Sequence, residues 1–172
     1  AVGNEYTLST CQLDFCLPMK FDLKYVSKDG DKKTPVVLHR AILGSLDRFM
    51  AYILEETKGA LPLWLSPTQI NVIPVNNEYH TEYANKIYEL LKDNGFRVNI
   101  DLRDEKLSYK MRESQTKKIP YTLILGDKEK ENNNISYRCF GNTDTKTIDT
   151  HEFILLLKEQ IRDKKWVTLF FF

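Results

Sequence analysis

Two prolines in one short apolar stretch divide this chain into parts with different sequence patterns. Residues 61–67 read LPLWLSP, and Pro62 and Pro67 prevent a helix or a central strand from running through this segment. Before it, apolar and polar residues alternate; after it, short apolar runs alternate with helical periodicity. The stretch therefore predicts a packed linker and a domain boundary within the 172 residues.

The part before the prolines predicts antiparallel strands followed by one helix. Alternation of apolar and polar residues favours strands over 11–16, 21–26 and 35–39. The last two are joined by a turn at 27–31, where an Asp-Gly pair supplies the positive φ of a tight hairpin. Ser45 is a candidate N-cap, and an apolar stripe at helical spacing follows it.

The part after the prolines alternates strand and helix in the order βαβαββα. This order predicts an α/β fold, a mixed sheet flanked by helices. A polar turn is expected at 126–134, and Asp149 is expected to cap the last helix. The other expected elements are strands at 69–75, 96–100, 121–125 and 135–140 and helices at 78–94 and 106–117.

Composition excludes some classes of protein. The net charge is only +1, so any nucleic-acid surface must be a local patch. The three cysteines form no C-x-x-C pair, and their odd number argues against a disulfide framework and for a reducing compartment. No apolar run reaches the roughly 20 residues of a membrane helix, so we expect no membrane partner.

A basic run covers residues 103–118. It contains six basic against three acidic residues, a net charge of +3. The basic residues are Arg103, Lys106, Lys110, Arg112, Lys117 and Lys118. Taken alone, such a run is most often a solvated helix face, and its other interpretation is a surface that contacts phosphates.

Several short motifs, taken in order, resemble one family. The motifs are LSTCQLDFCLP at 8–18, VLHRAILGSLDRF at 37–49, LWLSPTQ at 63–69, DLRDEK at 101–106, KIPY at 118–121 and GDKE at 126–129. In this order and spacing they resemble the threonine–tRNA ligases, which are class II aminoacyl-tRNA synthetases. The resemblance runs from about residue 3 to about residue 164 and implies a C-terminal portion of such an enzyme.

The resemblance implies a division into domains. Residues 1–62 would be the end of the class II catalytic domain, with its motif 3, and residues 63–67 a linker. Residues 68–164 would be a complete anticodon-binding domain. The remaining residues, 165–172, would be a tail of unknown origin, apolar and β-prone from Trp166 to Phe172.

The first part would carry pieces of the substrate pockets. The resemblance places ATP at Gly44, Ser45 and Arg48, where a planar arginine suits phosphate binding and adenine stacking. It places the substrate threonine at Thr10 and Gln12. We expect ATP to bind with Mg²⁺, and we assign no catalytic residue to the chain.

A zinc ion is also implied, through His39. Zinc with an open coordination position would bind the amino and hydroxyl groups of threonine and reject valine. The family's other two ligands lie upstream of Ala1, so the site is incomplete, and we do not assign Cys11 or Cys16 in their place. Asp14, on the same strand as Gln12, is expected to orient its neighbours.

The second part would read the anticodon of threonine tRNA. By position, Asp104, Lys118, Glu129 and Arg138 match the family's anticodon-reading residues. The family often has asparagine where Asp104 stands and arginine where Lys118 stands. In this context the basic run becomes a candidate phosphate-contacting face.

The implied whole protein is a cytoplasmic or organellar homodimer that attaches threonine to its tRNA through threonyl-adenylate. Because class II motif 2 is missing from the sequence, we expect this chain alone to be inactive. The alternative is a non-catalytic tRNA-binding module or a synthetase-like paralogue. Retention of Gln12, His39 and Arg48 favours the enzyme, since a binding module has no use for them.

Overall fold

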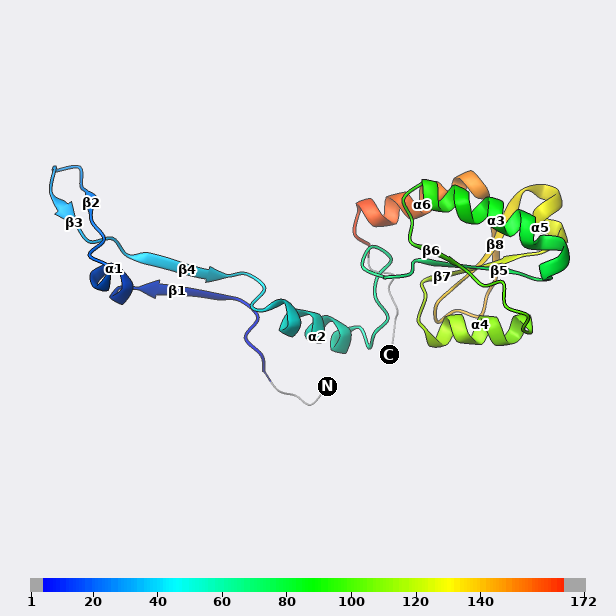
Figure 1. Ribbon diagram of the computed structural model, residues 1–172, viewed down its shortest axis with the longest axis horizontal. Coiled ribbons are helices and arrows are strands. Elements are labelled where there is room, and N and C mark those ends of the chain that lie inside the picture. The colour runs from blue at the N-terminus through cyan, green and yellow to red at the C-terminus, as the bar shows by residue number, and fades with distance from the viewer. Residues whose placement is uncertain (1–4, 166–172) are drawn as a thin grey trace. The chain divides into compact units, whose positions relative to one another are not determined.

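The computed structural model describes residues 5–165, so the expected apolar segment Trp166 to Phe172 lies outside the described residues. The chain forms two compact units, Ala1–Gly59 and Ala60–Phe172. They are called unit 1 and unit 2, and each is considered by itself (Figure 1).

Unit 1 is built around a two-stranded antiparallel ribbon. Its elements are β1 (Thr10–Asp14), α1 (Cys16–Lys20), β2 (Tyr25–Val26), β3 (Lys32–Lys33), β4 (Val37–Ala41) and α2 (Leu46–Glu56). β1 pairs with β4, and β2 pairs with β3 around the expected turn. Antiparallel strands, a hairpin turn and a following helix are therefore confirmed.

Three expectations for unit 1 were wrong. The strand expected at 21–26 is reduced to Tyr25–Val26, and the strand at 35–39 pairs with β1 instead. The strand expected at 11–16 stops at Asp14, because that carboxylate accepts hydrogen bonds from the Cys16 and Leu17 amides at 2.8 and 3.0 Å. These bonds hold the start of a short helix, α1, which the alternating pattern did not indicate.

α2 begins as its sequence predicts. Ser45 has an extended backbone, and its hydroxyl accepts a hydrogen bond from the Arg48 amide at 3.3 Å. This is the N-cap arrangement, which satisfies one of the free amides of the first turn. The helix ends at Glu56, and Gly59 follows with a positive φ.

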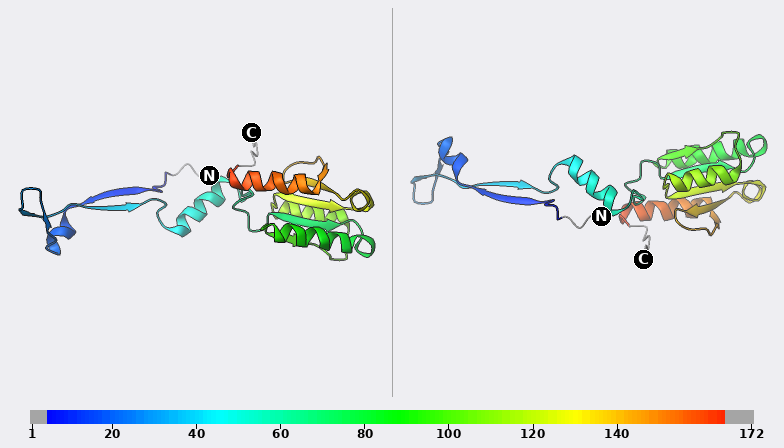
Figure 2. Two further views of the ribbon diagram at one scale, coloured as in Figure 1. Left: turned by 90° about the horizontal axis from the view of Figure 1, so that it is seen from above. Right: turned by 90° about the horizontal axis from the view of Figure 1, so that it is seen from below.

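Unit 2 is a five-stranded mixed sheet with helices on both faces (Figures 1 and 2). Its elements are β5 (Ile70–Pro74), α3 (Asn77–Asp93), β6 (Val98–Ile100), α4 (Leu107–Thr116), β7 (Tyr121–Leu125), α5 (Asp127–Asn132), β8 (Asn134–Cys139), β9 (Lys146–Asp149) and α6 (Thr150–Arg162). The strand order is β6-β5-β7-β8-β9, with β5, β6 and β7 parallel and the β7–β8 and β8–β9 pairs antiparallel. The expected α/β fold is confirmed.

The structure adds two elements to the expected order. The segment 126–134, expected to be a polar turn, contains α5; its sequence DKEKEN has no apolar stripe to reveal a helix. Glu129 accepts a hydrogen bond from the Gly126 amide at 2.9 Å, and Asn133 ends the helix with φ of 55°. β9 was also missed, because its sequence KTID is polar and lies at the edge of the sheet.

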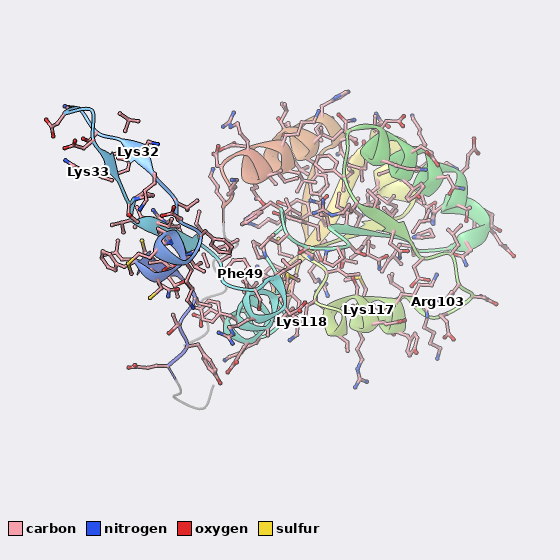
Figure 3. The ribbon with its side chains drawn as sticks, turned by 60° about the vertical axis from the view of Figure 1, so that its left-hand side comes forward. Lys32, Lys33, Phe49, Arg103, Lys117 and Lys118 are labelled. Atoms are coloured by element: carbon pink, nitrogen blue, oxygen red, sulfur yellow. The ribbon has the colours of Figure 1, made fainter. Side chains whose placement is uncertain are left out.

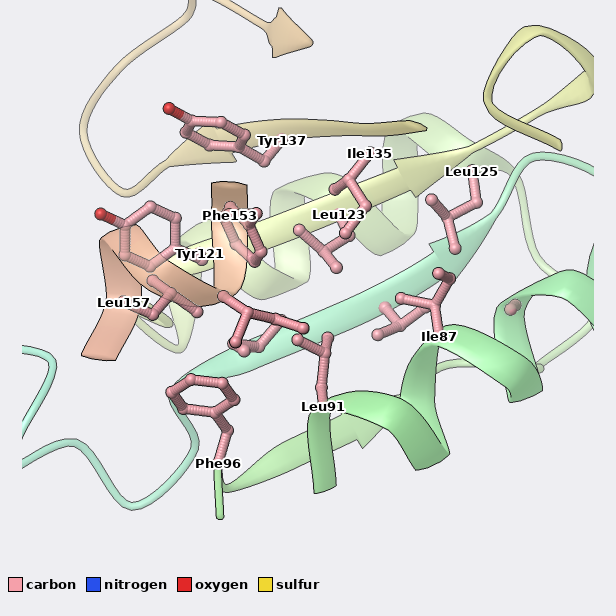
Figure 4. Close-up of a cluster of buried hydrophobic side chains, with 14 of the residues drawn as sticks. Ile87, Leu91, Phe96, Tyr121, Leu123, Leu125, Ile135, Tyr137, Phe153 and Leu157 are labelled. Carbon is pink, nitrogen blue, oxygen red and sulfur yellow. The ribbon is translucent and has the colours of Figure 1, made fainter. Parts of the chain in front are cut away.

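The core lies between the sheet and the pair α3 and α6 (Figure 4). α3 contributes Ile87 and Leu91, and α6 contributes Phe153 and Leu157, all with 1% exposure or less. They pack on the apolar side of β5, β7 and β8, whose side chains alternate between the two faces. The other face carries α4 and is more polar: Ser114 of α4 bonds Thr122 of β7 at 2.6 Å. Among the described residues, no helix is long and apolar enough to cross a membrane.

Candidate functional site

The β1–β4 ribbon brings three expected site residues onto one face. Gln12 lies directly opposite His39, and Thr10 lies opposite Ala41, two residues along each strand. Opposite residues of an antiparallel pair share a face, as do residues i and i+2 of one strand. Thr10, Gln12 and His39 therefore form a polar row on this face, all with exposed side chains.

Asp14 fixes the orientation of His39, as expected of it. Its Oδ2 atom lies 2.8 Å from His39 Nε2, while its Oδ1 atom accepts the amides at the start of α1. The Leu17 amide, and after it His39, hold the pKa of Asp14 below its ordinary value. The carboxylate is therefore kept charged, which favours the His39 tautomer that carries its proton on Nε2.

That tautomer leaves His39 Nδ1 as the nitrogen with a free lone pair, the arrangement of many metal-binding histidines. Within residues 5–165, however, no group of three or more His, Cys, Asp or Glu side chains is placed to hold a metal ion. The described residues therefore fit one ligand of a zinc site and do not fit a whole site.

The start of α2 collects the expected nucleotide-binding residues. Gly44 has φ of 65°, and a Cβ atom there would lie 3.2 Å from the Leu8 carbonyl oxygen. Both facts require glycine, because a side chain would be strained and would meet a backbone oxygen. Ser45 caps the helix, and Arg48 is exposed in its first turn.

A second group of polar residues lies in unit 2 at the carboxyl ends of β5, β6 and β7. These strands are parallel, so the segments that follow them meet at one edge of the sheet. Asp104 is exposed in the segment after β6 and faces a cleft of about 320 Å³. The polar residues that line this cleft are Asn76, Asn77, Glu78, Asp104, Glu105 and Lys110.

Glu129 lies at the same edge, in the helix that follows β7. Its Oε2 accepts from the Gly126 amide at 2.9 Å, and its Oε1 accepts from Ser136 Oγ at 2.6 Å. The side chain is half-buried, so its orientation is held on both oxygens. Each carboxylate oxygen retains a second lone pair for a further donor.

Lys118 and Arg138 lie at the opposite end of β7. Lys118 precedes that strand with φ of 54°, and Arg138 lies opposite Thr122, its second residue. Arg138 donates to Thr145 Oγ1 at 3.1 Å, and its buried Nε has no partner among the described residues. The four expected anticodon residues therefore form two groups, Asp104 and Glu129 at the carboxyl ends of the parallel strands and Lys118 and Arg138 at the opposite end of β7, and they are not one cluster.

The expected phosphate-contacting face needs correction (Figure 3). Lys110 is 2% exposed and lies on the buried face of α4, so it contacts no phosphate. Arg103 forms ion pairs with Asp101, at 2.6 Å, and with Glu113; Lys117 also pairs with Glu113, at 2.7 Å. Lys117 first, and then Arg103, hold the pKa of Glu113 below its ordinary value. Two of the six basic residues are thus paired with carboxylates of their own unit, and a third is buried.

Sequence patterns did not identify the side chains that support these sites. Asn77 bonds the carbonyls before Asp104, and His80 bonds the first residue of α5. The Asn-Asn pair at the start of α3 is a recognisable helix-start signal, but nothing in it shows which asparagine faces the neighbouring loop. Lys110 lies on a polar helix, where burial of an ammonium group is not expected.

Comparison with known families agrees with this geometry. Residues 69–160 match the model of the anticodon binding domain, and residues 1–57 match that of the class II tRNA synthetase core domain for the G, H, P, S and T enzymes. The chain therefore belongs to the anticodon-binding domain family, and a segment of a class II core precedes this domain.

Within that class, the chain is similar to threonine–tRNA ligases, as its motifs indicated. It is 49% identical to the enzyme of Oceanobacillus iheyensis and 52% identical to that of Staphylococcus carnosus, each over 96% of the chain. It spans only 26% of the length of either relative.

Solved structures give the same result. The RNA-binding domain of threonyl-tRNA synthetase from Cryptosporidium parvum covers 92% of this chain, with 36% identity and a TM-score of 0.82; the match takes 40% of that chain. Prolyl-tRNA synthetase from the same organism shares the fold. The match has 18% identity and a TM-score of 0.72, and it covers 91% of this chain and 34% of that one.

Proposed function

We propose that unit 2 reads the anticodon of threonine tRNA for a threonine–tRNA ligase. The observation that carries this proposal is the continuous similarity to these enzymes through both the class II segment and the anticodon-binding domain. Residues 68–164 are the proposed domain, 63–67 the linker and 1–62 the catalytic segment.

The charge at the carboxyl edge indicates which part of the RNA faces it. Glu78, Asp104 and Glu105 are exposed around the cleft, and Asp127 and Glu129 lie in the adjoining helix. Carboxylates repel phosphates but accept hydrogen bonds from base amino groups. Unstacked anticodon bases present such groups, so we propose that Asp104 and Glu129 accept from base edges.

Lys118 and Arg138 have the opposite charge and lie at the other end of β7. We propose that they contact the phosphates or an acceptor edge of a flanking base. Of the other exposed cations of the basic run, Arg103 and Lys117 form ion pairs with Glu113, which leaves chiefly Lys106 and Arg112. The dependence of affinity on salt should therefore be shallow for an RNA-binding domain, with a slope of log K against log salt of about −1 to −2.

RNA titration tests this assignment. A transcript of threonine tRNA and the same transcript with an altered anticodon are titrated into the chain at two salt concentrations. We expect tighter binding of the threonine transcript, and loss of this preference in Asp104→Ala and Glu129→Ala. Equal affinity of the wild-type chain for both transcripts contradicts the proposed function.

For unit 1 we propose a share of the substrate pockets of the whole enzyme. Thr10 and Gln12 would contact threonine, and Gly44, Ser45 and Arg48 would contact ATP, with its Mg²⁺. His39, oriented by Asp14, would supply one zinc ligand, and the metal would add Lewis acidity toward the amino and hydroxyl groups of threonine. The whole enzyme is proposed to be a homodimer of the cytoplasm or an organelle.

This chain alone is expected not to form threonyl-adenylate. Unit 1 contributes few substrate contacts, and the described part of it buries a single side chain, Pro18. A catalytic pocket requires groups held rigidly by surrounding structure. Pyrophosphate exchange dependent on threonine should stay at the blank without enzyme, and exchange clearly above that blank would contradict the expectation.

A further inference from the structure

The first turn of α3 occupies the middle of the carboxyl edge of the sheet. In the order β6-β5-β7, β5 lies between the strands whose following segments carry Asp104 and Glu129. α3 follows β5, so its first residues lie between those two segments (Figure 1). This turn is thus the element best placed to set the spacing between the two carboxylates.

Asn77 binds the segment that carries Asp104. Its Nδ2 donates to the carbonyls of Leu102 and Arg103 at 2.8 and 3.0 Å. Its Oδ1 faces the buried ammonium of Lys110 at 3.4 Å, and Lys110 also donates to the Asp101 carbonyl at 3.2 Å. Three consecutive carbonyls before Asp104 are therefore held by one carboxamide and one ammonium group.

These contacts replace the strand pairing that this segment lacks. β6 ends at Ile100, so the carbonyls of residues 101–103 lie beyond the last paired residue. Polar groups near a buried ammonium group need partners, and a backbone held at three successive carbonyls has little freedom to move. Asn77 and Lys110 therefore restrain the backbone that carries Asp104, together with the Asp101 carboxylate, which accepts from the Arg103 amide at 3.2 Å.

His80 binds the segment that carries Glu129. Its side chain is 4% exposed, and its Nδ1 accepts from the Asn76 amide at 3.1 Å. Since Nδ1 is the acceptor, Nε2 bears the proton and donates to Asp127 Oδ1 at 3.0 Å. Asp127 is the first residue of α5, two residues before Glu129.

A role in starting α3 accounts for only part of the contacts of these two side chains. Asn76 is the N-cap, and its own side chain accepts from the Glu78 amide at 2.7 Å. His80 Nδ1 also accepts the amide of this N-cap residue, but both Asn77 and His80 reach the neighbouring segments as well, 25 and 47 residues away along the chain. They join separate parts of unit 2 at the carboxyl edge of its sheet.

We propose that Asn77 and His80 are positioning residues that set the spacing of Asp104 and Glu129, and through it the selectivity of unit 2 for the anticodon; this rests on the proposed function. Hydrogen bonds weaken steeply with misalignment, so a shift of either carboxylate lowers its ability to distinguish one base edge from another. Contacts to the RNA backbone do not depend on this spacing.

Two variants with matched controls test the proposal in the full chain. Asn77→Ala removes the hold on residues 102–103, and its control is Asn85→Ala, the same change two turns along α3 at an exposed position. Asp127→Ala removes the partner of His80 from an exposed position, and its control is Glu131→Ala, which removes one carboxylate from the same helix. None of these changes removes a core side chain.

Each protein is titrated with the threonine transcript and with the transcript of altered anticodon, and its melting temperature is measured. In Asn77→Ala and in Asp127→Ala we expect the ratio of the two affinities to fall roughly fivefold, with little change in affinity for the altered transcript. Both controls should retain the wild-type ratio.

The outcomes distinguish a failure of the positioning role from a failure of the proposed anticodon-reading function. If the wild-type chain itself shows no preference, the proposed function fails. If the wild type discriminates and both variants discriminate equally well, the positioning role is overturned and the function stands. An equal loss of affinity for both transcripts, or the same fall in the control proteins, also overturns it, because a general loss of structure would act in that way.

Discussion

Unit 1 and unit 2 follow the same local rules but differ in what their apolar side chains contact. Unit 2 buries sixteen side chains in one cluster between its sheet and two helices. In the described part of unit 1, Pro18 is the single buried residue, while Phe21 and Leu46 are more than 70% exposed. Caps and turns form in both units, so they do not depend on a core, whereas burial requires a facing surface.

This difference fits the lengths of the related proteins. The chain spans about a quarter of the threonine–tRNA ligases that it matches, and unit 1 matches their class II core. Exposed apolar side chains on both strands of the ribbon are what a segment of a larger core is expected to present. Unit 2, by contrast, contains a complete layered core of its own.

Hydrogen exchange should give the largest difference between the units. Amides of β5 and β7 are expected to exchange only on global unfolding, and those of β1 and β4 at least about a thousandfold faster, because an isolated two-stranded ribbon is marginally stable. Exchange followed by mass spectrometry of peptides measures both. Equal protection of β1 and β7 would show that unit 1 is stabilised by more than its described contacts.

Truncation of an aromatic side chain in each unit sharpens the comparison. Phe153 is fully buried and meets the Tyr121 ring edge-on at 5.6 Å, so Phe153→Ala should lower the free energy of unfolding by about 3–5 kcal/mol. Phe21→Ala, at a 71% exposed position, should change it by less than about 0.5 kcal/mol. Urea unfolding followed by circular dichroism measures both, and similar losses in the two variants would refute the assignment of the core.

Acid should affect unit 2 through Asp101. The Arg103 guanidinium holds the pKa of this carboxyl below its usual 3.8, so its stabilising effect is present above about pH 4 and is lost as the pH falls toward the lowered value. Asp101→Asn should cost about 1–2 kcal/mol at pH 7 and progressively less below pH 4. Urea unfolding at a series of pH values measures this convergence.

The matched control for acid is Asp14→Asn in unit 1. The pKa of Asp14 is also lowered, by the Leu17 amide and by His39, yet this residue belongs to unit 1 and is not a member of the cluster that stabilises unit 2. We expect the unfolding transition of unit 2 to be unchanged in this variant at every pH. A shift of that transition would show that the two units are coupled.

Removal of a helix cap from each unit should give the smallest difference in stability between the units. Asp149 accepts from the His151 and Glu152 amides at 2.8 and 3.3 Å, and Asp149→Ala should destabilise unit 2 by about 1 kcal/mol. Ser45→Ala removes the equivalent cap from α2 and should leave the unit 2 transition unchanged, with faster amide exchange confined to α2. Thermal melts and exchange together measure the pair, and a lower melting temperature in Ser45→Ala would contradict this expectation.

Local signals predicted most of the elements, because their causes lie within a few residues. The Ser45 and Asp149 caps and the alternation of strand and helix after Pro67 all follow from sequence spacing. α5 and β9 were missed because neither has an apolar pattern, and both depend on contacts with β8, such as Glu129 with Ser136. The partner of the strand at 35–39 was also missed, since local alternation does not specify which strand pairs with which.

In the candidate sites, too, some features could be predicted from the sequence and others could not. The shared face of Thr10, Gln12 and His39 follows from strand periodicity once the register is known. The basic run was misjudged because a count of charges shows neither partners nor burial: Arg103 also pairs with Asp101, which lies outside the counted residues, and Lys110 is buried. The contacts of Asn77 and His80 join segments 25 and 47 residues apart, a distance over which local patterns carry no information.

The strand order of the unit 2 sheet and of the β1–β4 ribbon has a consequence for self-association. Within the described residues, the edges of the unit 2 sheet are β6 and β9, of three and four residues, and β9 carries Lys146 and Asp149; short, charged edges discourage pairing with another chain. Both strands of the β1–β4 ribbon have an open edge, and each exposes a leucine, Leu13 and Leu38. At high concentration, this chain should therefore aggregate through unit 1 ribbons that add edge to edge, with unit 2 remaining folded.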